Sequence, residues 1–109
     1  MDTKEILIKA KGLIDSPEKW CKGGFAVDIN NHIVSVKSES AVCWCAGGAT
    51  RKFTGMHNWQ VGEVALSRFK PSGFNSVFGY NDHPDTTHED IMNLFDKAIA
   101  AATNGTTSQ

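Results

Sequence analysis

The chain has 109 residues, of which 40% are apolar and 21% are charged, a size and composition that suit one domain with one core. Eleven basic residues face twelve acidic ones and the formal net charge is -1, so no overall field favours nucleic acid or an anionic membrane. The apolar runs are far shorter than the ~20 residues that span a bilayer, and the charged start has no signal-type apolar segment. We therefore expect a soluble, cytoplasmic protein without a membrane partner.

The first segment has the pattern of an amphipathic helix. Asp2 and Glu5 have the spacing of a capping box. Four apolar residues then share one helical stripe: Ile6, Ala10, Leu13 and Ile14. Ser16 followed by Pro17 predicts a short helical turn that leads to Cys21.

The middle of the chain combines a β-rich stretch with a second helical stripe. Residues 25–28 and 32–36 predict the two strands of a hairpin, with Asn30-Asn31 at its tip because Asn tolerates positive φ. An apolar stripe predicts a helix over residues 41–53. Gly47 and Gly48 lie inside it, and we interpret them as positions where another element approaches the backbone closely.

The last third of the chain predicts two more helices around a loop. One helix is expected to begin at Asn58 or Trp59 and to end before Pro71, and residues 74–83 are predicted to form a loop. The last helix is capped either by Thr86 with Glu89 or by Thr87 with Asp90, and its stripe is Ile91, Leu94, Phe95, Ala98, Ile99 and Ala102.

The predicted fold is therefore α+β, mainly α, with about four helices, near 50% helix, packed with one short β-hairpin. We expect one globular domain over residues 3–102 and a disordered polar tail over residues 103–109.

The three cysteines lie in two segments that nearly repeat each other, Trp20-Cys21-Lys22-Gly23-Gly24 and Trp44-Cys45-Ala46-Gly47-Gly48. Their odd number suits a reducing compartment. Cys43 and Cys45 flank a single residue, and on a helix they would point about 200° apart, so we predict no metal and no cofactor. We predict that Trp20, Cys21, Trp44, Cys45 and Phe95 belong to the structural core.

Cys45 also allows a second interpretation, in which its thiol is a nucleophile activated by a base. The favoured interpretation is a buried thiol with a raised pKa. On that basis Cys45→Ala should be tolerated, while Cys45→Ser should cost more because a buried hydroxyl needs a partner.

Candidate binding residues come from the aromatic and polar segments. Trp59, Tyr80, Asn81, Asp82 and His83 combine stacking and hydrogen-bonding groups, although Asn81 and Asp82 are also typical turn formers.

Two other groupings stay open. His83 and His88, with Asp82, Asp85 and Glu89, form either a metal cluster or a solvated helix N-terminus. Arg51, Lys52, Arg68 and Lys70, with Trp59 and His57, form an anion or nucleotide patch, or are isolated surface charges.

Several motifs together resemble an uncharacterised family of small bacterial and phage proteins, classed as a domain of unknown function. They are Trp20-Cys21-x-Gly23, the Asp28–Val34 hairpin, Cys43-Trp44-Cys45-Ala46-x-Gly48-Ala49, Tyr80-Asn81-Asp82, and Thr87-x-Glu89 leading to Leu94-Phe95-Asp96-Lys97-Ala98-Ile99. Members of this family often carry Trp where Tyr80 stands. The resemblance implies a bacterial or phage origin and brings no known activity, cofactor or catalytic residue.

We expect a small binding or interaction protein without catalytic residues, whose partner is another protein. By analogy with small phage-type proteins, an inhibitor of a host protein, such as a defence component, is one form of this hypothesis. The alternative is a small enzyme or nucleotide-binding protein that uses Cys45 or the Asp82, His83 and His88 region. The sequence leaves nucleic acid as a partner, and the oligomeric state, open.

Overall fold

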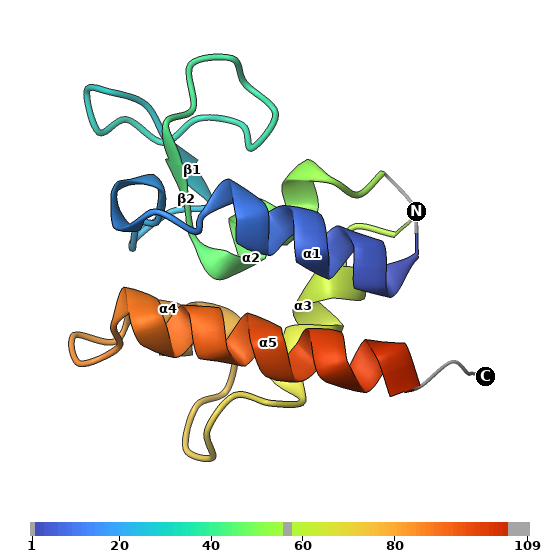
Figure 1. Ribbon diagram of the computed structural model, residues 1–109. Coiled ribbons are helices and arrows are strands. Elements are labelled where there is room, and N and C mark those ends of the chain that lie inside the picture. Colours follow the sequence, from blue (N-terminus) through green and yellow to red (C-terminus); the bar gives the residue numbers. More distant parts are fainter. Residues whose placement is uncertain (1, 56–57, 105–109) are drawn as a thin grey trace.

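A computed structural model describes residues 2–55 and 58–104, and the following concerns these residues. They form five α-helices, one 3-10 turn and two short strands (Figure 1). In chain order the elements are α1 Thr3–Leu13, η1 Pro17–Lys19, β1 Ala26–Val27, β2 Cys43–Trp44, α2 Ala46–Lys52, α3 Val61–Ser67, α4 Val77–Asp82 and α5 His88–Asn104. The chain is 49% helical and 6% strand, which confirms the predicted α+β, mainly α class.

Helices α1 and α5 lie side by side and run in opposite directions (Figure 1). The predicted capping box of α1 is present: Glu5 N donates to Asp2 Oδ1 at 2.8 Å and Asp2 N donates to Glu5 Oε1 at 3.2 Å. The Lys11 ammonium donates to Asp96 Oδ1 at 2.6 Å and so joins the two helices. Thr87 and Asp90 cap the start of α5 reciprocally, at 2.9 and 3.1 Å, which selects the second of the two predicted caps.

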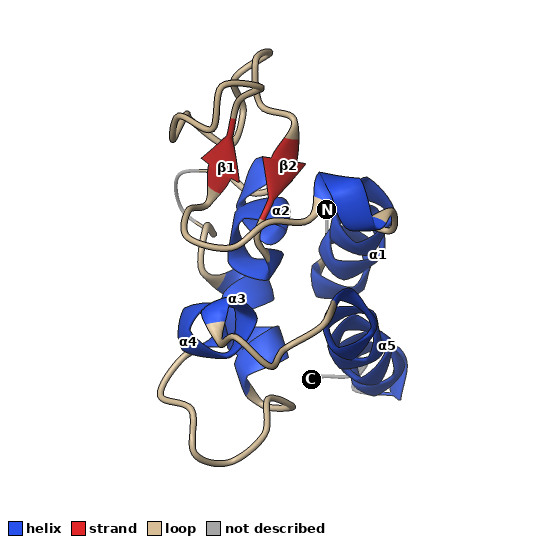
Figure 2. Cartoon of the chain, turned by 90° about the vertical axis from the view of Figure 1, so that its left-hand side faces the viewer, coloured by secondary structure: helices blue, strands red, loops and turns tan. Residues whose placement is uncertain are grey.

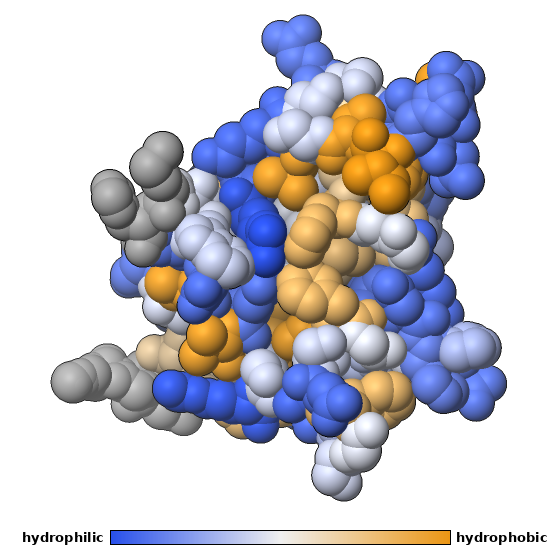
Figure 3. Space-filling model, turned by 180° about the vertical axis from the view of Figure 1, so that it is seen from behind, coloured by the Kyte–Doolittle hydropathy of each residue, from blue (hydrophilic) through white to orange (hydrophobic). Residues whose placement is uncertain are grey.

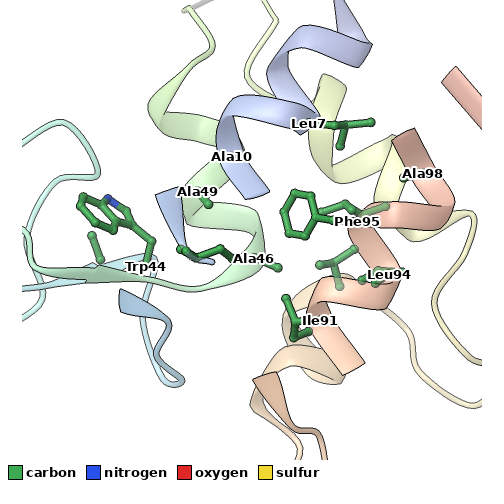
Figure 4. Close-up of a cluster of buried hydrophobic side chains, with 13 residues drawn as sticks. Leu7, Ala10, Trp44, Ala46, Ala49, Ile91, Leu94, Phe95 and Ala98 are labelled. Carbon is green, nitrogen blue, oxygen red and sulfur yellow. The ribbon is translucent and has the colours of Figure 1, made fainter. Parts of the chain in front are cut away.

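The core lies between α1, α2 and α5. Phe95 is fully buried and points from α5 toward α1 and α2, while Trp44 lies on the other side of α2 (Figure 4). Helix α2 contacts α1, α3, α4 and β2. In the side view, α1 and α5 are stacked on one side of the molecule, and the strands, α3 and α4 lie on the other (Figure 2). The apolar stripes predicted for the first and last helices therefore meet at α2.

The β-hairpin has a different second strand from the predicted one. Strand β1 pairs with β2 in antiparallel register, Ala26 opposite Trp44 and Val27 opposite Cys43. The predicted second strand, residues 32–36, makes only an isolated bridge from Ile33 to Val27. The turn itself is where we predicted it: Asn31 has φ 67° and the Asp28 carboxylate accepts from two backbone N–H groups of the turn. Burial explains why residues 43–44, and not residues 32–36, form the second strand, since Cys43 and Trp44 are buried whereas Ile33 is 70% exposed.

Helix α2 is shorter than predicted, because residues 43–44 are a strand and Cys45 is the N-cap. Val42, an apolar residue of the helix predicted over residues 41–53, is exposed. The close-packing role predicted for the two glycines is confirmed. A Cβ at Gly47 would lie 2.4 Å from the Phe78 ring, and one at Gly48 would lie 1.9 Å from the Phe25 carbonyl oxygen.

The segment predicted as a loop over residues 74–83 contains α4, so that prediction was wrong. Ser76 caps this helix, with Gly79 N donating to Ser76 Oγ at 3.1 Å. Helix α5 extends through Thr103 and Asn104, which we had assigned to the tail, and residues 105–109 lie outside the described part. Within residues 2–55 and 58–104, no helix has both the length and the apolar character needed to cross a membrane.

Candidate functional site

The Asn81 amide joins three segments that are distant in sequence. Asn81 is fully buried on α4. Its Oδ1 accepts from Trp20 Nε1 at 2.6 Å and from Ala46 N at 3.0 Å. Its Nδ2 donates to the Cys21 carbonyl at 3.1 Å and to Asp82 Oδ1 at 2.9 Å. Both atoms of the amide are thus used inside the protein, as buried polar groups require.

The two near-repeats meet beside this amide. Trp20 and Trp44 form a parallel bridge, and Cys21 N donates to the Trp44 carbonyl at 3.1 Å. Gly23 N donates to Asp82 Oδ1 at 3.1 Å, and the Lys22 ammonium donates to the His83 carbonyl at 2.7 Å. Three of the motifs that carry the family resemblance, those around Cys21, Cys45 and Asn81, therefore contact one another. We infer that they maintain the fold at this point.

The predicted binding residues on α4 separate into different environments. Asn81 lies inside the protein, so its burial conflicts with the hypothesis that it contacts a partner at the surface. Tyr80 is half-buried and packs against Phe74, with ring centroids 5.1 Å apart, and burial raises its pKa. His83 is exposed and lies 5.4 Å from Phe74. Phe74 is thus a contact residue that the sequence analysis did not single out.

Cys45 caps α2, with Gly48 N donating to its sulfur at 3.2 Å. Only 3% of Cys45 is exposed, and burial raises the pKa of its thiol to about 11. Burial, and a hydrogen bond with Cys43, also raise the pKa of Cys21. Both thiols are therefore protonated near neutral pH, when they are weak nucleophiles.

The helical geometry used to separate Cys43 from Cys45 was wrong. Cys43 lies in β2 and Cys45 follows it with extended backbone, φ -77° and ψ 173°, and residues i and i+2 of an extended chain share one side. Among the described residues, no group of three or more His, Cys, Asp or Glu side chains has an arrangement that could hold a metal ion.

The Asp82, His83 and His88 region is not one cluster in the described part of the chain, where no hydrogen bond or ion pair joins Asp82 to either histidine. His83 Nδ1 accepts from Asp85 N at 3.1 Å. His88 Nε2 lies 2.7 Å from the Ile14 carbonyl oxygen, and its ring lies 5.9 Å from that of Trp20. Each side chain is occupied by a different part of the fold.

The candidate binding surface lies on the outer side of α3, where exposed side chains share one helix face. Gln60, Val64 and Arg68 are four residues apart, which places them on one helix face, and all three are exposed. Trp59, next to them, is 40% exposed and Val64 is 49% exposed. We call these four residues the α3 surface. Trp59 and Arg68 were candidate residues from the sequence, whereas Gln60 and Val64 were not.

Two hollows flank the α3 surface and share Trp59, Gln60 and Val64. The first has a volume of about 530 Å³ and is lined by Thr3, Asn58, Trp59, Gln60, Val61, Val64, Ala65 and Arg68. The second has a volume of about 320 Å³ and is lined by Arg51, Trp59, Gln60, Glu63, Val64, Ser67, Asn75, Ser76, Val77 and Phe78. Both volumes are in the range of ligand-sized clefts.

Arg51 forms the charged wall of the second hollow, and its charge is already balanced. Its guanidinium donates to both carboxylate oxygens of Glu63. The same group lies 4.1 Å from the Phe25 ring centroid and 4.4 Å from that of Trp59. Phe25 in turn meets Phe78 edge to face, with centroids 4.9 Å apart. Figure 3 shows apolar residues gathered along the middle of the face opposite α1 and α5.

The other members of the predicted anion patch do not converge on one point. The Lys52 ammonium lies 5.5 Å from the Trp44 ring centroid, and the Lys70 ammonium donates to Ser67. The Arg68 guanidinium has no hydrogen bond or ion pair with any residue that the structure describes. His57 lies outside the described residues.

The structure is thus a small, mainly α-helical α+β fold in which the segments around Cys21, Cys45 and Asn81 are joined through one buried amide. The chain belongs to the Family of unknown function (DUF6197), whose model matches residues 1–101. Neither a curated protein nor a solved structure gives a significant match to the chain.

Proposed function

We propose that the protein acts by binding another protein through the α3 surface, without catalysing a reaction. The observation that carries the proposal is an exposed tryptophan beside an exposed valine, with a hollow on each side. Exposed apolar groups flanked by polar residues are typical of protein-binding surfaces, and tryptophan often dominates the binding energy when a partner covers it.

Two details support a pre-formed surface. The stack of Arg51 between the rings of Phe25 and Trp59 holds the indole at the edge of the second hollow. The Arg51–Glu63 ion pair joins α2 to α3. A partner would then meet rigid groups and lose little entropy in ordering them.

The finer form of the proposal is an inhibitor that occupies a bacterial host protein, such as a defence component. It rests on the small size of the chain and on its resemblance to bacterial and phage proteins. The alternative, an enzyme that uses Cys45, is weaker because the thiol is buried and its pKa is raised to about 11.

A capture experiment with matched variants tests the proposal. The immobilised wild-type protein, Val64→Lys and Ile8→Lys are exposed to a bacterial lysate, and bound proteins are identified by mass spectrometry. Ile8 is the control because it is 47% exposed, is also helical, and lines neither hollow.

We expect a protein that the wild type and Ile8→Lys capture equally and that Val64→Lys loses. Circular dichroism and thermal melting of all three proteins check that each is folded. Captured proteins that respond equally to both substitutions, or to neither, would place the binding surface elsewhere or show that none exists.

A further inference from the structure

We propose that the first hollow accepts a carboxylate group, so that the partner presents an acidic segment with apolar side chains to the α3 surface. This inference rests on the proposed function, and it names the chemistry of the partner. It follows from the charges around the two hollows, which differ although the hollows share one wall.

Arg68 is the distinctive group of the first hollow. It is exposed, and no residue in the described ranges pairs with its guanidinium. The other described residues that line this hollow are uncharged: Thr3, Asn58, Trp59, Gln60, Val61, Val64 and Ala65. The described side chains at the hollow therefore contribute one unbalanced positive charge. Arginine recognises carboxylates through two parallel N–H donors.

In the second hollow, no described cation is left unpaired to attract an anion. Arg51, the one cation among the described residues that line it, is paired with the Glu63 carboxylate, which also lines the hollow. Its remaining lining is polar and uncharged or apolar, and includes the rings of Trp59 and Phe78. An apolar side chain of the partner fits this environment better than a charged one. The α3 surface therefore fits a partner that places a carboxylate on one side of Val64 and an apolar side chain on the other.

Two peptides that differ only in charge provide the probe. The first is acetyl-Leu-Glu-Leu-Glu-Leu-amide, and in the second lysine replaces both glutamates. Each is titrated into the full-length protein while two-dimensional NMR follows the α3 amide signals and the Trp59 indole signal. The proteins are the wild type, Arg68→Gln, and Lys70→Gln as the matched control, since Lys70 lines neither hollow.

We expect the affinity of the acidic peptide, obtained from the shifts of the α3 signals, to be at least tenfold higher than that of the basic one. Arg68→Gln should weaken the acidic peptide by about three- to fivefold, the size of an exposed ion pair, and Lys70→Gln should leave it unchanged. Added salt should weaken the acidic peptide alone, because screening acts on exposed charges. Equal affinity of the two peptides, no binding of either, or an acidic-peptide affinity that Arg68→Gln leaves unchanged would overturn the proposal.

The outcomes separate this inference from the proposed function. A captured protein that depends on Val64, together with failure of the acidic peptide, would keep the binding function and reject the acidic partner. Peptide binding that depends on Arg68, with no captured protein, would keep the carboxylate site and reject the protein-binding function.

Discussion

At the scale of single residues, the Asn81 amide matters because it satisfies polar groups that are buried or partly buried. It accepts from Trp20 Nε1 and Ala46 N, and it donates to the Cys21 carbonyl. Each buried polar group that loses its partner costs about 1–3 kcal/mol. We therefore predict that Asn81→Ala lowers the free energy of unfolding by roughly 3 kcal/mol or more, measured by urea denaturation.

Asn93→Ala is the matched control for this prediction. Asn93 is exposed on α5, so the same truncation should change the unfolding free energy by less than about 0.5 kcal/mol. Equal and small losses for the two variants would show that the Asn81 hydrogen bonds do not hold the three segments together.

Cys45 illustrates how the structure reverses a prediction from the sequence. We expected serine to be worse than alanine at this position because a buried hydroxyl would lack a partner. The Cys45 sulfur in fact accepts from Gly48 N as the N-cap of α2, and serine is a preferred N-cap whereas alanine is poor. The order of the two substitutions should therefore be the opposite.

We now predict that Cys45→Ala costs about 0.5–2 kcal/mol of unfolding free energy, the usual value of a lost cap, and that Cys45→Ser costs less. Guanidinium denaturation of the wild type and both variants makes the comparison. If Cys45→Ser were the less stable variant, the Gly48 N–H would not be supporting a side-chain cap at this position.

At the scale of elements, the approach of the Phe25 backbone, just before β1, to α2 depends on a missing side chain. A Cβ at Gly48 would lie 1.9 Å from the Phe25 carbonyl oxygen, which is backbone and cannot rotate away. We predict that Gly48→Ala destabilises the domain by about 1–3 kcal/mol, as overpacking does, measured as a fall in unfolding free energy.

Gly12→Ala is the control for Gly48→Ala. Gly12 lies in α1, and a Cβ there would meet no atom within 4 Å. This change should stabilise the domain by about 0.5 kcal/mol, because alanine is the better helix former. Tolerance of both substitutions would mean that the Phe25 backbone does not lie against Gly48 of α2 as described.

The docking of α5 gives a second prediction at this scale. Phe95 is fully buried between α1, α2 and α5 (Figure 4), and truncation of a buried phenylalanine costs about 3–5 kcal/mol. We expect Phe95→Ala to lose that amount in chemical denaturation, and the neighbouring exposed Lys97→Ala to lose almost none. A loss under about 1 kcal/mol for Phe95→Ala would show that α5 is not docked through this ring.

The elements that the sequence predicted well are those with long regular patterns. Helices α1 and α5 have both caps and stripes, so local information defines them. The second strand and α4 were missed for another reason. Two residues, Cys43 and Trp44, form β2, and the six residues of α4 include Gly79. Such short segments are decided by tertiary contacts, here with β1 and with the Trp20 segment.

At the scale of the whole molecule, the family motifs and the candidate binding surface are separate. Trp20, Cys21, Asn81 and Asp82 bind one another through the buried amide and its neighbours. The α3 surface comes from a segment that the motifs do not include. Its four residues, Trp59, Gln60, Val64 and Arg68, are exposed, so a partner could contact them.

The candidate site was only partly predictable for a physical reason. Trp59 is conspicuous in the sequence because exposed tryptophan is uncommon, and Arg68 is a charge. Gln60 and Val64 are ordinary residues whose exposure depends on which side of α3 faces α1, α2 and α5. The four-residue spacing of Gln60, Val64 and Arg68 could have indicated one face. Only the packing shows that this face is the outer one.

Hydrogen–deuterium exchange of the protein, free and bound to a captured partner, tests the central claim most directly. Partner binding at the α3 surface should slow exchange of the α3 amides, residues 61–67, and leave the Trp20–Gly23 segment and α5 unchanged. Protection of the Trp20–Gly23 segment or of α5, with no change in α3, would contradict the account.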